Sequence, residues 1–218
     1  MRPPPDCPMK RLQLTRRAAG WTDEAVRHID AAGCDIAVIR RPPPVECDAL
    51  VAGGTLGEVR FTTAARGAAA KIDRALARLD LVKPARQRAA FADDILSLVC
   101  GMLAVFSWPR VEVRLDLTDE QSCPKFHCDN VLVRLVTTYA GPGTEYVEMP
   151  AADTVHRVAP GSLVLLKGHQ HPTHADRVRH RSPPLRPGTR RLCVAIDRAD
   201  WLTAATPDPA PDDTGALG

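Results

Sequence analysis

Residues 108–117 read WPRVEVRLDL, and the hydrophobic period of the chain changes within this stretch. Before it, the apolar residues between Ala92 and Phe106 recur at intervals of three, one and three, which indicates one face of a helix that begins after Pro84. After Pro109, apolar and charged residues alternate from position 111 to 117, the period-2 pattern of a half-buried strand. Because helices precede strands, the order predicts an α+β fold.

The chain on either side divides into elements with few ambiguities. A helix capped by Thr22, a strand near 36–39, a strand near 58–62 and a helix over 71–81 are expected before position 84. Beyond position 117, Gly and Pro turns separate short strands, which we expect at 130–139, 144–147, 154–158, 162–166 and 190–196. Many short strands with such turns favour a sandwich or a jelly-roll or cupin-like barrel, buttressed here by the N-terminal helices.

This pattern predicts four parts along the chain. Residues 1–20 are rich in Pro and Arg and are expected to form a flexible arm. Residues 21–109 form a mainly helical part with one or two strands that join the barrel, and residues 110–203 form the barrel core with a metal site. Residues 204–218 are dominated by Pro, Asp and Gly and are expected to be a disordered tail.

Composition excludes several classes of protein. The net charge of +3 is spread along the chain, and no Lys or Arg run is interleaved with aromatic residues, so nothing favours a nucleic-acid partner. No stretch is apolar enough to cross a membrane, and the start lacks the apolar core of a secretory signal, so we expect a cytoplasmic protein. The seven cysteines are scattered without a CxxC pair and are expected to be free thiols. The oligomeric state stays open.

One short motif can carry chemistry. In the segment CPKFHCD at 123–129, His127 and Asp129 are two residues apart, so in an extended chain both side chains point to one face and Cys128 points away. His180, which precedes Pro183-Pro184 and the final strand, is the candidate for a third ligand. Two imidazoles and one carboxylate occupy one face of an octahedral metal ion and leave three positions open, as in non-haem Fe(II) oxygenases.

The succession of these elements resembles the Fe(II)/2-oxoglutarate-dependent dioxygenases. Their double-stranded β-helix carries HxD on an early strand, a second histidine late in the fold, and a basic residue about ten positions further that holds the carboxylate of 2-oxoglutarate. The resemblance implies that His127, Asp129 and His180 bind Fe(II) and that Arg190, ten positions after His180, binds 2-oxoglutarate. Arg191 takes that role if the register is shifted by one residue.

A closer resemblance covers about residues 110–197. The motifs CPxFHxD at 123–129, GPGTE at 141–145 and HRSPP at 180–184 look like an uncharacterised bacterial family whose members are often encoded near zinc-homeostasis genes. Most relatives have Trp where this chain has Tyr146. No activity is assigned to this family, so the resemblance supports the metal site but implies no substrate.

Several nearby side chains have two interpretations. Tyr139 either faces the pocket and touches a co-substrate or is a buried core tyrosine. His169, His171 and His174 either bind zinc or belong to a solvated loop, Cys123 and Cys128 are possible sulfur ligands, and Lys167 either faces an acidic substrate or buries its stem. Glu145 is either an acceptor that orients a ligand histidine or a plain turn carboxylate.

Three functions are compatible with this sequence. The first is an Fe(II)- and 2-oxoglutarate-dependent oxygenase that hydroxylates an unknown small-molecule or protein substrate. The alternative is a non-catalytic zinc-binding or metal-homeostasis protein that uses the same pocket. A third is a cupin-like isomerase or lyase that uses the metal as a Lewis acid.

Overall fold

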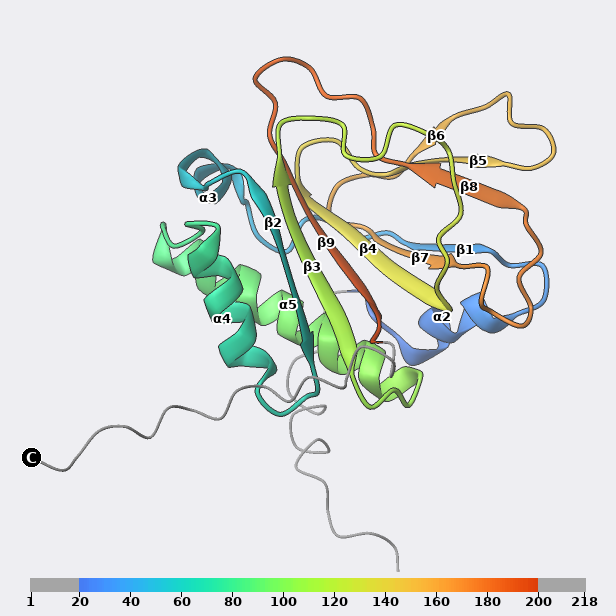
Figure 1. Cartoon of the computed structure of the whole chain (residues 1–218), viewed down its shortest axis with the longest axis horizontal. Helices are drawn as coiled ribbons and strands as arrows, with labels where there is room; N and C mark the ends of the chain where they lie inside the picture. The colour runs from blue at the N-terminus through green and yellow to red at the C-terminus, as the bar shows by residue number, and fades with distance from the viewer. Residues whose placement is uncertain (1–19, 200–218) are drawn as a thin grey trace, which may run out of the picture.

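The computed structural model describes residues 20–199, which form two antiparallel sheets with helices on the outer side of the larger one (Figure 1). The six-stranded sheet has the order β1-β7-β4-β9-β3-β2, and the three-stranded sheet has the order β6-β5-β8. The strands are β1 (Ile36–Ile39), β2 (Gly57–Thr63), β3 (Val111–Thr118), β4 (Val133–Ala140), β5 (Glu145–Glu148), β6 (His156–Arg157), β7 (Leu163–Lys167), β8 (Val178–Arg181) and β9 (Arg191–Arg198).

The helices precede most of the strands, as the sequence predicts. They are α2 (Asp23–Arg27), the 3-10 helix η1 (His28–Asp30), α3 (Asp48–Gly53), α4 (Ala68–Arg78) and α5 (Ala85–Val105). The Thr22 hydroxyl accepts a hydrogen bond from the backbone N–H of Ala25 and so caps α2. None of the helices within residues 20–199 is long and apolar enough to span a membrane.

Strand alternation divides the hydrophobic side chains between two cores. On β9, Leu192, Val194 and Ile196 face the helices, where they join the larger core with α4 and α5. Cys193 and Ala195 face the small sheet, where they join a second core that includes side chains of β4 and β7. The large sheet is therefore buried on both faces. One face packs against the helices, and the other faces the small sheet.

The predicted α+β jelly roll is confirmed in this two-sheet form. No hydrogen-bonded ladder within residues 20–199 closes the two sheets into a continuous barrel. The short helix α3 was not expected from the sequence, and β4 begins at Val133 rather than at position 130. The predicted arm, apart from Gly20, and the predicted tail lie outside the described residues.

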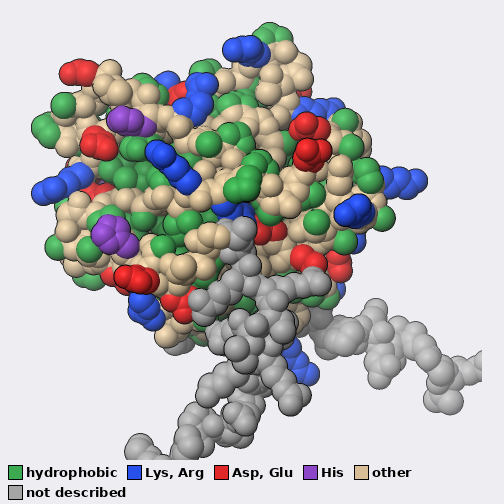
Figure 2. All heavy atoms as spheres, turned by 180° about the vertical axis from the view of Figure 1, so that it is seen from behind, with side chains coloured by type: hydrophobic (Ala, Val, Ile, Leu, Met, Phe, Trp, Pro, Cys, Tyr) green, Lys and Arg blue, Asp and Glu red, His purple; other side chains and the backbone are tan. Residues whose placement is uncertain are grey.

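Charges of both signs are mixed over the surface. On the face drawn in Figure 2, Lys and Arg side chains lie among Asp and Glu side chains without a large patch of one sign. One of the exposed pairs joins α4 to α5, where Arg88 and Asp73 have their nitrogen and oxygen atoms 2.7 Å apart.

One buried charge network ties the large sheet to α5. Arg41 donates from both terminal nitrogens to the carboxylate of Asp94 at 2.7 Å, and its side chain is 1% exposed. The hydroxyl of Tyr139 donates to the same carboxylate, and the Tyr139 ring packs edge-on against Phe91 with 4.5 Å between ring centroids. Burial, followed by the charge of Asp94, raises the pKa of Tyr139 well above its usual value. Tyr139 is thus a core residue with a satisfied hydroxyl.

Glu145 stabilises the small sheet. Its carboxylate accepts hydrogen bonds from Arg157 and from the Nε of Arg181, the latter at 2.9 Å, so it does not orient a ligand histidine. Burial alone would raise the pKa of Glu145, but the hydrogen bonds and charges of Arg157 and Arg181 outweigh it and lower the pKa below its usual value.

This shift predicts a pH-dependent contribution to stability. A carboxylate whose pKa is lower in the folded than in the unfolded chain contributes stability above the unfolded value of about 4.3, and the contribution is lost as the pH falls through the folded value. We expect Glu145→Gln to lower the free energy of unfolding by about 1–2 kcal/mol at pH 7, an amount that shrinks toward zero in acid. Denaturant unfolding of both proteins at pH 7 and below pH 4 measures it. An equal difference at both pH values would contradict this assignment.

Candidate metal centre

A pair of backbone hydrogen bonds holds the two candidate histidine ligands side by side. The N–H of His127 donates to the carbonyl of His180 at 3.0 Å, and the N–H of His180 donates back at 2.9 Å, an isolated antiparallel bridge beside β8. Residues paired in this way carry their side chains on the same face. The two imidazole rings accordingly lie with their centroids 4.5 Å apart, although the residues are 53 positions apart in the chain.

The carboxylate of Asp129 completes the group. Its Oδ2 lies 3.2 Å from Nε2 of His180, and its Oδ1 lies 3.6 Å from Nε2 of His127. The three ligand atoms lie within 4.8 Å of one another, so a single ion between them is in reach of all three. The structure therefore brings together the predicted triad His127, Asp129 and His180.

Neighbouring groups orient each ligand. Arg134 donates to Oδ1 of Asp129 at 2.6 Å, and its Nε donates to Asp197 at 2.7 Å, so the carboxylate is clamped on one side. Nδ1 of His127 lies 2.9 Å from the carbonyl oxygen of Lys125, which fixes the proton on Nδ1 and leaves Nε2 free to bind an ion. Such outer contacts set the ring orientation and the tautomer of a metal-binding histidine.

The charges of the group perturb its pKa values in opposite directions. The neighbouring carboxylate of Asp129 raises the pKa of His127 above its usual value, against the opposing effect of burial. Burial alone would raise the pKa of Asp129, but His127, His180 and Arg134 outweigh it and lower the pKa well below its usual range. Asp129 is therefore ionised at neutral pH and supplies the negative charge that a divalent cation needs.

One buried oxygen of the site, 3.2 Å from Nε2 of His180, has no hydrogen bond. Oδ2 of Asp129 is buried and accepts no hydrogen bond, while Arg134 holds the other carboxylate oxygen. A buried polar atom without a hydrogen bond costs about 1–3 kcal/mol, so such atoms call for a ligand. The unpartnered oxygen and the free Nε2 atoms of two histidines suit a divalent ion such as Fe(II), which takes imidazole and carboxylate ligands.

Arg190 and Arg191, the two residues predicted to bind the carboxylate of 2-oxoglutarate, point in different directions. The expectation that Arg190 faces the site is wrong, because its Nη1 donates to the carbonyls of Val51 and Gly54 at 2.8 and 2.9 Å and so satisfies the end of α3. Arg191 shares the strand face of Cys193 and is 4% exposed. The alternative register, in which Arg191 points between the sheets, is the one observed.

Arg191 is a buried cation with neutral partners. Its Nη2 donates to the hydroxyl of Thr138 at 3.1 Å, and its Nε donates to the carbonyl of Pro142 at 3.0 Å. The same Nη2 lies 3.5 Å from the hydroxyl of Thr144, two residues before Tyr146, which pairs with His180. Thr144 directly precedes β5, the strand that pairs with β8 and so with His180. Within residues 20–199 no carboxylate pairs with Arg191.

Tyr139 does not lie with the triad, and the expectation that it contacts a co-substrate is wrong. The chain bends at residues 130–132, between Asp129 and the first residue of β4. Side-chain alternation holds only within a continuous strand, so the shared parity of Tyr139 and Asp129 has no consequence across the bend. Tyr139 instead donates to Asp94 on the helix side of the large sheet.

A second group of possible ligands lies on the other side of the 127–129 segment. Sγ of Cys128 lies 4.0 Å from Nε2 of His174, and the ring of His174 contacts that of His169 with 4.8 Å between centroids. His171, expected as part of a histidine cluster, turns away and contacts Asp30, with 3.3 Å between nitrogen and oxygen. Burial raises the pKa of the Cys128 thiol to about 11. Sequence spacing alone did not join Cys128 to these histidines.

The remaining candidates have structural roles in the described chain. Lys167 is buried and donates to the carbonyl of Ala31 at 2.9 Å and to the hydroxyl of Thr173 at 2.8 Å, so it ties β7 to η1 rather than facing a substrate. Cys123 is an exposed free thiol outside both ligand groups of residues 20–199.

Comparison with known proteins supports the fold of this site. A family model described as "Protein of unknown function (DUF1826)" matches residues 22–197. The chain resembles the crystal structure of the dioxygenase for auxin oxidation in rice, with 19% identity, a TM-score of 0.50, and 81% of this chain and 77% of that chain covered. No curated protein sequence matches the chain.

Two other solved structures are similar at lower scores. The dioxygenase for auxin oxidation 1 from Arabidopsis thaliana, in complex with 2-oxoglutarate, has 12% identity and a TM-score of 0.46 over 85% of this chain and 90% of that one. A prolyl-4-hydroxylase from Pseudomonas putida has 16% identity and a TM-score of 0.43 over 84% of this chain and 98% of that one. The likeness to the rice enzyme shows the jelly-roll fold of the oxygenases, and the chemistry rests on the residues of this chain.

Proposed function

The chain belongs to the DUF1826 family, whose function is unknown, and we propose that it is an Fe(II)- and 2-oxoglutarate-dependent oxygenase that hydroxylates a substrate still to be identified. The observation that supports this function most is the convergence of His127, Asp129 and His180, with a buried oxygen of Asp129 that accepts no hydrogen bond. Fe(II) held there supplies oxidative chemistry with dioxygen, coupled to the decarboxylation of 2-oxoglutarate.

In this proposal Arg191 binds the distal carboxylate of 2-oxoglutarate. A guanidinium offers a planar fork that matches a carboxylate, and a buried guanidinium without an anionic partner is costly. The hydroxyls of Thr138 and Thr144 accept from Arg191, and their own hydrogens can be donated to the same carboxylate. The apolar side chains between the sheets, among them Val136 and Val164, exclude water from the carbon chain of the bound acid.

The remaining residues of the site hold the triad in place. Arg134 keeps Asp129 ionised and aimed at the histidines, and Asp197 keeps Arg134 from rotating away. Across the small sheet, Tyr146 pairs with His180 and stacks on His156 with 4.9 Å between ring centroids. This aromatic row forms one wall beside the metal ligands, so we assign it to substrate contact.

Turnover without a substrate tests the proposal directly. Protein purified without oxygen and loaded with Fe(II) should convert 2-oxoglutarate to succinate slowly, and omission of Fe(II) should abolish the conversion. Calorimetry should detect binding of 2-oxoglutarate by the Fe(II) protein in the absence of oxygen. Retained zinc, with neither 2-oxoglutarate binding nor succinate formation after Fe(II) loading, would favour the non-catalytic zinc protein or a Lewis-acid isomerase instead.

The two neighbouring arginines provide a matched pair of variants. We expect Arg191→Lys to raise the dissociation constant of 2-oxoglutarate roughly 10- to 100-fold, because a hydrogen bond between charged groups contributes about 1.5–3 kcal/mol and lysine lacks the planar fork. Arg190→Lys, which changes only the contact with α3, should leave that constant within about twofold. Calorimetric titration of both variants measures the constants. Equal losses in both, or none in Arg191→Lys, would remove Arg191 from this role.

A further inference from the structure

Backbone hydrogen bonds hold the loop between β7 and β8 against residues 128–132. The N–H of His169 donates to the carbonyl of Asp129 at 2.9 Å, and the N–H of Gly168 donates to that of Leu132 at 3.0 Å. A Cβ atom on Gly168 would lie 2.2 Å from the carbonyl oxygen of Val131, so only glycine permits this approach. The loop and the 128–132 segment therefore form one compact unit.

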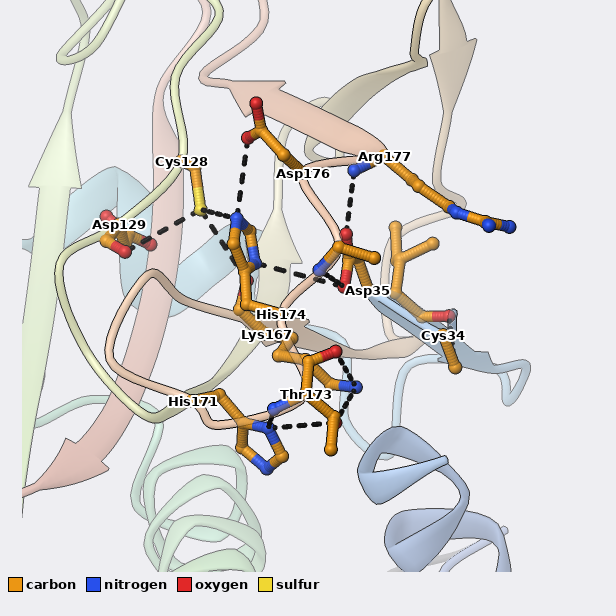
Figure 3. Close-up of polar contacts among 12 residues, drawn as sticks. Cys34, Asp35, Cys128, Asp129, Lys167, His171, Thr173, His174, Asp176 and Arg177 are labelled. Carbon is orange, nitrogen blue, oxygen red and sulfur yellow. Dashed lines mark hydrogen bonds and ion pairs between the residues drawn. The ribbon is translucent and has the colours of Figure 1, made fainter. Parts of the chain in front are cut away.

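Three side chains with metal-binding atoms converge inside this unit. The ligand atoms of Cys128, His169 and His174 lie within 4.8 Å of one another. In Figure 3 the sulfur of Cys128 points at the ring of His174, and the carboxylate of Asp129 lies on the other side of the chain. The group is thus separate from the His127–Asp129–His180 group, although Cys128 and Asp129 are neighbours in sequence.

A buried carboxylate stands behind His174 in the position that orients a metal-binding histidine. Oδ1 of Asp35 lies 3.8 Å from Nδ1 of His174, and this Nδ1 is buried without a hydrogen bond. The Asp35 carboxylate is 1% exposed and accepts the backbone N–H groups of Ala175 and Arg177, at 3.1 and 2.7 Å, so its position is determined by the loop. At 3.8 Å this contact is an ion-pair contact rather than a hydrogen bond, and a carboxylate on this side favours the proton on Nδ1, the tautomer that leaves Nε2 available to a metal ion.

We propose that Cys128, His169 and Nε2 of His174 form a second metal site that binds Zn²⁺. One thiolate and two imidazoles are ligands that Zn²⁺ takes in proteins, whereas the oxygen-rich sites of Mg²⁺ and Ca²⁺ contain no sulfur. Three protein ligands leave one tetrahedral position, and the exposed His169 places that position toward solvent. Asp176, whose Oδ1 lies 3.4 Å from the same Nε2, is held by Arg179, so the proposal assigns the fourth position to a water molecule rather than to Asp176.

The site does not require the function proposed for the first group. Its ion joins Cys128 to the 168–174 loop and so fixes the backbone that carries Asp129, a structural role that a zinc ion performs without redox chemistry. The two sites differ in their ligands, since only the second contains sulfur. This difference makes them separable by spectroscopy.

Cobalt is the spectroscopic probe for the second site. Full-length protein freed of metal with a chelator should take up Co²⁺ and show the absorption band of a thiolate–cobalt bond, and Zn²⁺ should displace the cobalt and abolish the band. His127→Ala, which removes a ligand of the first site only, should retain the band. Cys128→Ala and His169→Ala should lose it and weaken Zn²⁺ binding at the second site at least about 100-fold, more than the loss of an outer contact.

His171→Ala is the matched control, because His171 lies in the same loop and outside the ligand group. It should keep both the band and the affinity for Zn²⁺. His169 is exposed, so its replacement tests the site in a protein whose core is unchanged. A band that is absent from the wild-type protein, or one that persists in either Cys128→Ala or His169→Ala, would overturn the proposal, whatever the outcome for 2-oxoglutarate.

Discussion

An Asp129→Ala variant is expected to lose at least about 100-fold in affinity for Fe(II) and, with it, all Fe(II)-dependent succinate formation. Asp129 supplies the only carboxylate among the three ligands of the first site, and its Oδ2 lies between the two histidines. Since changes in outer contacts alone cost about 10- to 100-fold in metal affinity, loss of a direct ligand must cost more. Anaerobic titration with Fe(II) and analysis of bound iron measure the effect.

The fold should survive this substitution. Arg134 keeps its ion pair with Asp197 when Asp129 is removed, so no buried cation is left alone. Asp119→Ala, an exposed carboxylate shortly before the site, is the matched control and should keep wild-type affinity. If Asp129→Ala binds Fe(II) as tightly as Asp119→Ala does, the triad does not form the metal site.

The second large effect concerns stability. We expect Asp94→Ala to lower the free energy of unfolding by about 3–5 kcal/mol, because it leaves Arg41 as a buried charge without a counter-ion and Tyr139 without its acceptor. In a chain of this size, 1 kcal/mol shifts the melting temperature by about 2–4 °C, so the transition should fall by roughly 10 °C. Thermal and denaturant unfolding of the purified variant provide both numbers.

Asp73→Ala is the surface counterpart of this variant. Asp73 forms an ion pair with Arg88 at 2.7 Å, but its side chain is 55% exposed, and exposed pairs contribute about 0–1 kcal/mol. Asp94→Ala and Asp73→Ala each remove a carboxylate that contacts an arginine. The first carboxylate is buried, and the second is exposed. Equal effects would mean that the Arg41–Asp94–Tyr139 network does not stabilise the junction of α5 with the sheet.

Local patterns predicted the elements well where they are long and uninterrupted. The apolar stripe before Pro109 is α5, and the alternation from Val111 onward is β3 with every apolar side chain buried toward the helices. The triad was predictable because HxD places two ligands on one face and because the resemblance to the dioxygenases supplied the third. In each case the information lies within a few residues or in a short motif.

Two predictions failed at a bend or a turn: Tyr139, which was assigned by strand alternation, and Arg190, which was assigned by its spacing of ten residues after His180 in the resemblance. The bend at 130–132 separates Tyr139 from the parity of Asp129, and the turn before β9 decides that Arg191, not Arg190, lies between the sheets. Each error is one residue of register, and one residue reverses the face of a strand. A local sequence pattern does not show which face of the strand a residue occupies after a turn.

By itself the sequence determined the order of helices and strands, the buried faces of the longest elements, and His127, Asp129 and His180 as candidate metal ligands. Only the tertiary structure decided that His127 and His180 pair through their backbones, that Arg191 is the buried cation, and that Cys128 meets His174. The physical reason is that hydrophobic periodicity acts over a few residues. Pairing between distant strands depends on turns, on register and on the packing of both faces of the large sheet, which are properties of the folded chain as a whole.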